Sequence, residues 1–246
     1  MSDGELVPVP TKGRTFSGAR RVRLGDVAPS GRIRLDALAR FLQDISYDDT
    51  HDAGLNPRLG WVVRRTVMEI QRWPRYGELV DLITFCGGIG SRWSERRVAI
   101  RDDAGPLVEA ATMWVHLDPD NGRPKPLPQE FHDLFGEAAG GRVVSARLHH
   151  RDPPSDAERT PWPTRSVDFD VHAHMNNAVY WVAVEHFLPL SDPLPAVRVE
   201  LEFRQQITPT DPVVVRSVVS EGTVEMWLTG VDGAVHASGA LRPLTP

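Results

Sequence analysis

A dense set of ionisable and amide side chains lies in the last third of the chain. Asp170, His172 and His174 fall within five positions, and Asn176 and Asn177 follow directly. An apolar segment that can form a buried helix comes next. Titratable groups this close together at the start of a helix are typical of sites that transfer protons.

Structural roles would explain the same residues differently. Asp170 can close a loop as an Asx turn, and Asn176 or Asn177 can cap the helix that follows. Alternate residues of an extended strand share a face, so Asp170, His172 and His174 could also bind a metal. The sequence shows no third His or Cys nearby, and we expect neither a metal nor a cofactor.

The first half of the chain predicts one strand, one helix and four further strands. Apolar residues at Leu35, Leu38, Phe41, Leu42 and Ile45 have helical spacing and one buried face. Strand-like runs punctuated by Gly, Pro, Asp and Asn surround this helix. The predicted strands cover residues 14–24, 61–73, 79–87, 93–102 and 107–117, and the helix covers residues 33–49.

The second half repeats this order. A strand over 165–169 and a helix over 178–188 precede four strands, which cover 198–207, 213–220, 223–228 and 235–241. A long-period duplication of this kind predicts two similar units. In this alignment Asp26 is the counterpart of Asp170, and the turn at 74–77 is the counterpart of the turn at 208–211.

The duplication predicts an α+β fold made of two tandem units, each with a long helix against an antiparallel sheet. One such sheet cannot bury both faces alone, so the two units should pair as a pseudo-dimer within one chain. We place the N-terminal unit at residues 1–135, a linker at residues 136–160, and the C-terminal unit at residues 161–246. One short helix is predicted just before the linker, near residues 130–135.

The composition is that of an ordinary globular protein. Hydrophobic residues make up 41% of the 246 residues, charged residues 25%, and the net charge is −5, which disfavours nucleic-acid binding. No apolar run is long enough for membrane insertion, and the single cysteine, Cys86, fits a reducing compartment. We expect a cytoplasmic protein that is a monomer or homodimer.

Four segments in order resemble the acyl-acyl carrier protein (acyl-ACP) thioesterases, a family with a duplicated hotdog fold. They are residues 61–77 with their Trp, Arg and Tyr-Gly turn, residues 91–97, residues 113–128, and the stretch Asp170-x-x-x-His174-Met175-Asn176-Asn177-x-x-Tyr180. The last segment resembles the family's Asp-x-Asn-x-His-Val-Asn-Asn-x-x-Tyr site. This resemblance implies hydrolysis of fatty acyl-ACP, with acyl carrier protein as the partner.

The residues suit that reaction. Asp170 could act as general base or nucleophile, and His174 could orient water or bind the substrate carbonyl. Backbone N–H groups from Met175 to Asn177, at the positive end of the helix, offer an oxyanion hole.

Two positions depart from the family pattern. His172 stands where the family has Asn, and it could replace that Asn as a hydrogen-bond donor or add a titrating group. Gln206 stands where the family has Glu, and Gln cannot act as a base. We therefore place the catalytic role on Asp170 and His174, with His172 beside them, and treat Gln206 as a substrate-binding residue.

Two other functions remain open at this stage: an acyl-CoA thioesterase on the same fold, and a protein that binds acyl thioesters without cutting them. The arginines at 20–23, 64–65 and 96–97 offer a candidate docking patch for an acidic carrier protein.

Overall fold

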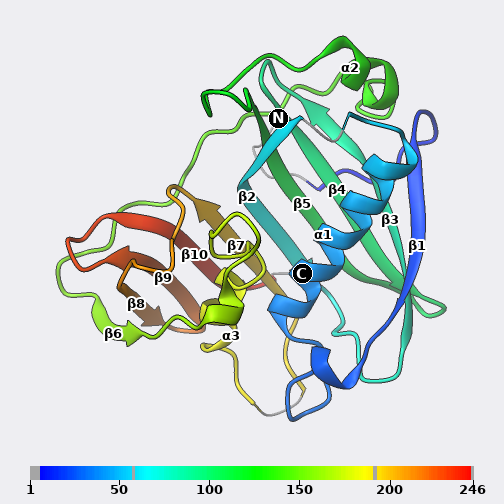
Figure 1. Cartoon of the computed structure of the whole chain (residues 1–246). Coiled ribbons are helices and arrows are strands. Elements are labelled where there is room, and N and C mark those ends of the chain that lie inside the picture. Colours follow the sequence, from blue (N-terminus) through cyan, green and yellow to red (C-terminus); the bar gives the residue numbers. More distant parts are fainter. Residues whose placement is uncertain (1–5, 57–58, 191–192, 245–246) are drawn as a thin grey trace.

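The computed structural model describes residues 6–56, 59–190 and 193–244 of the chain. A single antiparallel sheet of ten strands forms its frame, in the order β1-β3-β4-β5-β2-β7-β10-β9-β8-β6. Each half contributes five neighbouring strands, and the order in the second half mirrors that in the first (Figure 1). The sheet therefore confirms the α+β fold of two tandem hotdog units.

The first half holds the longer helix. Its strands are β1 (Thr15–Arg21), β2 (Gly60–Ile70), β3 (Leu79–Ile89), β4 (Trp93–Asp102) and β5 (Gly105–Leu117), and its helices are α1 (Leu35–Asp52) and α2 (Gln129–Phe135). The second half comprises β6 (Glu158–Trp162), α3 (Tyr180–Glu185), β7 (Val197–Phe203), β8 (Val213–Ser220), β9 (Thr223–Gly230) and β10 (Val235–Pro243).

The two halves join where β2 pairs with β7. The pairing is antiparallel and runs from Arg65 opposite Glu202 to Ile70 opposite Val197. One continuous apolar core crosses this junction and includes Leu38 of α1 and Trp181 of α3, both almost fully buried. Because α1 and α3 also contact each other, the halves form one body around a pseudo-twofold axis.

Helix α1 lies across the sheet of the first half, as Figure 1 shows. Its buried face comprises ten residues, most of them apolar and at the predicted helical spacing. Burying a Leu or Phe side chain contributes about 1.5 to 3 kcal/mol, so this face fixes the helix on the sheet. Among the described residues, no helix is long and apolar enough to cross a membrane.

Two predicted elements of the second half were wrong. Residues 165–169 do not form a strand: Ser166–Asp168 is a short 3-10 turn. The edge strand instead lies earlier, at β6, where it pairs with β8. The second helix is also short, six residues in α3 against the eleven predicted over 178–188.

Candidate active site

The predicted catalytic residues lie on a tight hairpin of five residues, 170–174. The Asp170 N–H donates to the His174 carbonyl at 2.9 Å, and the Ala173 N–H donates to the Asp170 carbonyl at 3.0 Å. Ala173 has a φ of 56°, a left-handed conformation that costs about 1 kcal/mol for a residue with a Cβ. The backbone therefore holds Asp170, His172 and His174 on one compact loop.

The side chains of this hairpin differ in exposure. Asp170 and His172 are exposed, whereas His174 is half-buried. The Asp170 Oδ1 accepts the His172 N–H at 2.8 Å, which is the Asx turn considered above. The carboxylate thus has one oxygen in the turn and remains open to solvent and to a ligand.

A hydrogen bond joins the hairpin to the segment that follows β7. The Met175 N–H donates to the Ile207 carbonyl at 2.8 Å, so Gln206 lies next to the residue that anchors the hairpin. The Ile207 N–H in turn donates to the Tyr180 hydroxyl at 3.3 Å. Burial raises the pKa of Tyr180 to about 12, so this phenol stays protonated at neutral pH.

The backbone amides of residues 175–178, just before α3, are not equivalent. The Met175 N–H is bound to a carbonyl as described, the Asn176 N–H donates to Asp168 O at 2.9 Å, and the Ala178 N–H donates to Asn176 Oδ1 at 2.9 Å. Asn176 therefore forms an Asx turn that leads toward α3, whose N-cap is Val179 rather than the predicted Asn176 or Asn177. Within the described part of the chain, the Asn177 N–H alone of these four has no protein acceptor, which leaves it available for an oxyanion.

The first half contains the same hairpin 142 residues earlier. The Ala28 N–H donates to the Arg32 carbonyl at 2.8 Å, and the Gly31 N–H donates to the Ala28 carbonyl at 2.8 Å. Gly31, with a φ of 84°, occupies the place of Ala173. Residues 28–32 thus reproduce the backbone of residues 170–174 without a carboxylate or an imidazole.

This superposition corrects the alignment predicted from sequence. Asp26 is the counterpart of Asp168, since each carboxylate accepts the backbone N–H that opens its 3-10 turn, at 2.8 and 2.7 Å. The true counterpart of Asp170 is Ala28. The hairpin therefore forms without the Asp170 carboxylate, and an Asx turn does not by itself explain the residue.

The turns after the central strands are offset by one residue from the prediction. The Ile33 N–H donates to Pro74 O at 2.8 Å, just as the Met175 N–H donates to Ile207 O. Pro74 therefore corresponds to Ile207, and Trp73 corresponds to Gln206. At that place the first half carries a buried indole and the second half an exposed amide.

The hairpin of the first half is closed by a buried ion pair. Arg32, the counterpart of His174, is fully buried and lies 2.7 Å from Glu185 of α3. Its guanidinium also lies 5.0 Å from the centre of the Trp73 ring. The Leu35 N–H, the counterpart of the Asn177 N–H, donates to Glu185 Oε2 at 3.0 Å. In the first half, the place that corresponds to the oxyanion site is thus occupied by the Glu185 carboxylate.

Three cavities lie between the open hairpin and the space beside α1, and each shares lining residues with the next. A polar cavity of about 420 Å³ is lined by Asp170, Asn176 and residues of α1. A neck of about 30 Å³ between Asn177 and Trp114 follows. Beyond it lies a cavity of about 400 Å³, the apolar chamber, where a group of apolar side chains is joined by polar and charged ones that include Arg20, Asp44 and Arg96. Its lining includes Leu55, Trp61, Trp114 and Phe131.

Gln43 and Asp44 on α1 were missed by the sequence analysis. Both line the polar cavity of about 420 Å³ and the apolar chamber of about 400 Å³, and Gln43 also lines the neck between them. The helical pattern placed them beside the buried face, but it does not show what they face. Alignment of the two hairpins in the correct register would have marked Gln43, which corresponds to Glu185.

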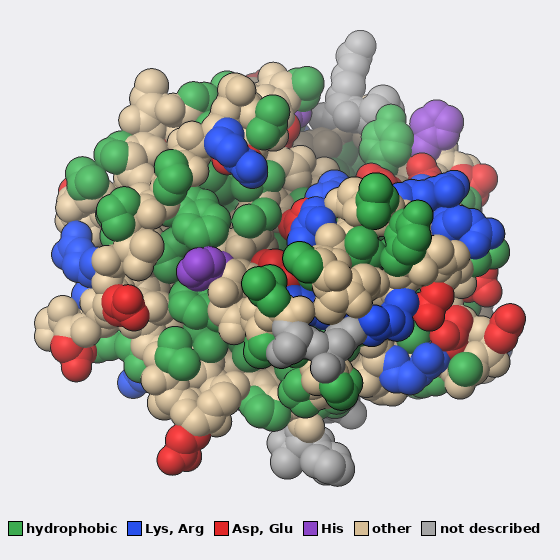
Figure 2. Space-filling model, turned by 90° about the horizontal axis from the view of Figure 1, so that it is seen from below, with side chains coloured by type: hydrophobic (Ala, Val, Ile, Leu, Met, Phe, Trp, Pro, Cys, Tyr) green, Lys and Arg blue, Asp and Glu red, His purple; other side chains and the backbone are tan. Residues whose placement is uncertain are grey.

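The predicted basic docking patch is partly wrong. Arg96 and Arg97 are buried in β4, where they pair with Asp49 and Glu109, and Arg65 is buried in β2. Arg21 and Arg23 are exposed, as expected, whereas Arg20 is half-buried and pairs with Asp48. In Figure 2, Lys and Arg side chains gather over the N-terminal half, on the right of the view.

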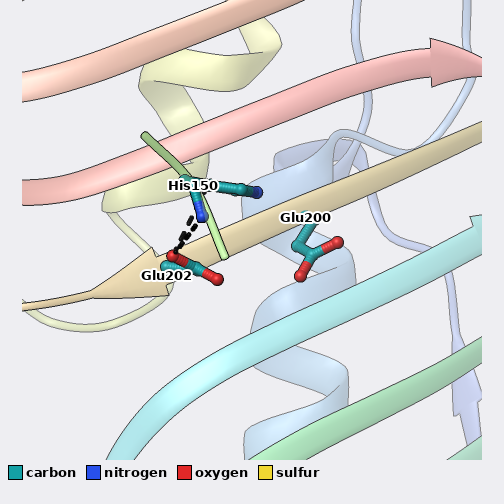
Figure 3. Close-up of side chains that lie close together, drawn as sticks. All are labelled: His150, Glu200 and Glu202. Carbon is teal, nitrogen blue, oxygen red and sulfur yellow. Dashed lines mark hydrogen bonds and ion pairs between the residues drawn. The ribbon is translucent and has the colours of Figure 1, made fainter. Parts of the chain in front are cut away.

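A second group of ligand-type side chains lies away from the hairpin. His150, Glu200 and Glu202 place their nitrogen and oxygen atoms within 4.8 Å of one another (Figure 3). However, the two Glu202 oxygens accept the backbone N–H groups of His149 and His150, at 2.5 and 3.1 Å. Glu202 therefore fastens the connecting segment to β7, and we assign no metal to this group.

Comparison with known proteins places the chain in a family. Residues 13–135 match the acyl-ACP thioesterase N-terminal domain, and residues 151–232 match the acyl-ACP thioesterase C-terminal domain. Together these matches cover most of the chain. The protein belongs to the acyl-ACP thioesterases, a family of thioester hydrolases.

Individual relatives are distant in sequence. An uncharacterized protein of Mycobacterium tuberculosis is 28% identical, over 98% of this chain and 97% of its own length. A chloroplastic acyl-[acyl-carrier-protein] hydrolase of Cuphea viscosissima is 24% identical, over 70% of this chain and 47% of its own length.

Solved structures share the whole fold. The 12:0-ACP thioesterase from Umbellularia californica has a TM-score of 0.78 at 21% identity, covering 96% of this chain and 100% of its own. An acyl-ACP thioesterase from Bacteroides thetaiotaomicron has a TM-score of 0.79 at 15% identity, covering 93% of this chain and 97% of its own. At these identities the likeness concerns the fold.

Proposed function

We propose that this chain hydrolyses the thioester of a fatty acyl group carried on acyl carrier protein, releasing the free fatty acid. One observation carries the proposal. The hairpin at 170–174 repeats the backbone of 28–32, yet it replaces Ala28, Ser30 and Arg32 with Asp, His and His. Residues 28–32 form the same hairpin without these three side chains, and Asp170 lines the polar cavity.

The cavity suits a thioester with a long apolar arm. The polar chamber beside Asp170 would take the thioester and the linker to the carrier, and the neck would lead the acyl chain to the apolar chamber beside α1. A site of this kind is concave, mostly apolar inside and polar at the reacting end. In this proposal the unit at 1–135 houses the acyl chain, and the unit at 161–246 supplies the chemistry.

The reaction needs one activated water and one oxyanion site. Asp170 takes a proton from water, whose oxygen forms a bond to the thioester carbon. The carbonyl oxygen becomes negative and is held by the Asn177 N–H. The C–S bond then breaks, and the thiolate that leaves takes up the proton. His174, half-buried at the base of the hairpin, orients the water, and His172 stands beside it.

Gln206 takes a substrate-binding role in this scheme. It is exposed and neutral, and it lies one residue before the carbonyl that anchors Met175. An amide there can hydrogen-bond to the substrate but cannot accept a proton from water. The scheme therefore depends on the Asp170 carboxylate alone.

The test is thiol release from acyl-ACP over a series of chain lengths, with acyl-CoA of the same lengths in parallel. We expect release from acyl-ACP by the wild type. Asp170→Ala and His174→Ala should each lower the rate by about 10²- to 10⁴-fold. Ser30→Ala, at the counterpart of His172 in the first half, is the matched control and should leave the rate unchanged.

Each alternative function has its own outcome in this assay. A rate on acyl-CoA that exceeds the rate on acyl-ACP would identify an acyl-CoA thioesterase. Binding of acyl thioesters without thiol release would identify a non-catalytic binding protein. Release that survives both Asp170→Ala and His174→Ala would refute the mechanism.

A further inference from the structure

The internal duplication gives each residue around the open hairpin a counterpart in the other half, and this includes a residue of α1. With the 142-residue offset, Gln43 on α1 corresponds to Glu185 on α3. Glu185 reaches across the pseudo-twofold axis to the hairpin of the first half. By the same pseudo-twofold symmetry, Gln43 is expected to lie across the axis beside the hairpin of the second half. Gln43 and Asp170 indeed line the same cavity.

The contacts of Glu185 show what this position does. One carboxylate oxygen lies 2.7 Å from the Arg32 guanidinium, and the other accepts the Leu35 N–H at 3.0 Å. Arg32 corresponds to His174, and Leu35 corresponds to Asn177. In the first half, therefore, the Leu35 N–H already donates to a carboxylate oxygen of Glu185. The matching N–H of the open site, that of Asn177, has no such acceptor among the described residues.

We propose that Gln43 completes the active site from the opposite unit, donating a hydrogen bond from its amide nitrogen to the thioester carbonyl oxygen beside the Asn177 N–H. This inference rests on the proposed function. The oxygen of Glu185 on Leu35 marks by symmetry the place of the substrate oxygen. With Gln43, two donors face the carbonyl oxygen, which stabilises the oxyanion more than the Asn177 N–H does alone.

The placement of Gln43 fits this role. Its side chain is exposed, and it lines the polar chamber, the neck and the apolar chamber. The residues that share the neck with it include Asn177 and Ala178. A thioester whose acyl chain passes through the neck must therefore place its reacting carbon beside Gln43.

The neutrality of Gln43 is part of the proposal. A carboxylate at position 43 would repeat the arrangement of Glu185, with one oxygen accepting the Asn177 N–H. It would also repel the negative charge that develops on the carbonyl oxygen. The difference between Gln43 and Glu185 thus accounts for one open site and one closed site in the same chain.

Gln43→Glu tests this directly, because it preserves size and adds only charge. At pH 8 we expect kcat on acyl-ACP to fall by about 10²-fold, the effect of losing one oxyanion-hole donor. Gln43→Ala should fall similarly. As the pH is lowered toward 5, the ratio of wild-type to Gln43→Glu rate should shrink, because the protonated Glu is again neutral and can donate.

Gln71→Glu is the matched control. Gln71 is exposed at the end of β2, away from the cavities, so the same chemical change there should leave the rate and its pH profile unaltered. A Gln43→Glu rate equal to the wild type, or a loss that does not change with pH, would overturn the role of Gln43. Absence of thiol release by the wild type would instead overturn the proposed function.

An amide NMR measurement separates these two failures. In Gln43→Glu at pH 8, the Asn177 amide proton should move downfield relative to the wild type, as expected of a donor to a carboxylate, and should return as the pH falls. An Asn177 resonance that is the same in both proteins at every pH would show that residue 43 does not face this amide, whether or not the wild type is active.

Discussion

The two hairpins of this chain, residues 28–32 and residues 170–174, share a backbone conformation and differ in residue type at all five positions. The first is closed: Arg32 is fully buried against Glu185, and the Leu35 amide is occupied. The second is open: Asp170 is exposed, and the Asn177 amide is free among the described residues. The first hairpin therefore holds the two halves together, whereas the second forms the candidate active site.

The difference shows how a duplicated fold separates stability from chemistry. A symmetric pair of units would offer two equivalent sites across the pseudo-twofold axis. Filling one of them with Arg32 and Glu185 ties α3 to the N-terminal hairpin. The other can then expose polar groups, since it does not have to hold the two halves together.

The largest expected effect on stability is at Glu185. Glu185→Ala leaves the buried Arg32 guanidinium without its counter-ion, and we expect a loss of about 3 to 5 kcal/mol in the free energy of unfolding. Gln43→Ala, at the symmetric position, should cost under about 0.5 kcal/mol because the side chain is exposed. Urea unfolding of both variants measures the difference.

The double variant Arg32→Met with Glu185→Leu sharpens this result. Replacing both charges with apolar groups should recover much of the loss, since no unpaired charge stays buried. If Glu185→Ala and Gln43→Ala lowered the free energy of unfolding equally, the description of the first hairpin as closed and the second as open would be contradicted.

A second effect, smaller in size, concerns Asp36 at the start of α1. Burial opposes its ionisation, but hydrogen bonds from Arg34 and Arg40 outweigh this and lower the pKa of Asp36 below its usual 3.8. The ionised carboxylate therefore stabilises the fold above that pH, and the contribution is lost as the pH falls through the lowered pKa. Asp36→Asn should cost about 1 to 3 kcal/mol at pH 7.

Thermal unfolding of the wild type and of Asp36→Asn across pH 7 to 2 measures this contribution. The gap between their melting temperatures should be constant above about pH 5 and should narrow below it. A gap that widens in acid would contradict the sign of the shift. The counterpart of Asp36 in the open half is Ala178, where no such pH-dependent contribution exists.

The smallest effect is at the fourth residue of each hairpin, Gly31 or Ala173. Gly31→Ala places a Cβ at a φ of 84° and should cost about 1 kcal/mol. Ala173→Gly removes the Cβ at a φ of 56°, but the gain is offset by the greater freedom of Gly in the unfolded chain. We expect Ala173→Gly to stabilise the fold by at most about 0.5 kcal/mol. Calorimetry of both variants measures these changes, and a Gly31→Ala variant more stable than Ala173→Gly would contradict the prediction.

Most elements followed from sequence because their patterns are local. The periodicity of Leu38, Phe41 and Ile45 predicted α1 within three residues of its ends, and alternation with turn residues predicted β4 with its exact bounds at 93 and 102. β6 was missed since Glu158–Trp162 is polar and contains Pro161, as edge strands often do.

The candidate site followed from residue types and their order, but its geometry did not. The structure places residues 170–174, which the sequence singled out as a group, on one hairpin, and their catalytic role stays a prediction. Their counterparts were misassigned, because Asp26 and Asp170 are each followed by Val although the hydrogen bonds match Asp26 to Asp168. The burial of Arg96 and Arg97 also depends on distant partners, which no local pattern reveals.

The central claim is that the hairpin at 170–174 provides chemistry rather than structure, and one variant tests it most directly. Residues 170–173 are replaced by the sequence of residues 28–31, through Asp170→Ala, Val171→Pro, His172→Ser and Ala173→Gly. We expect a melting temperature close to that of the wild type, and a rate of thiol release from acyl-ACP lower by about 10³-fold or more. A folded variant that hydrolyses acyl-ACP at the wild-type rate would contradict the account.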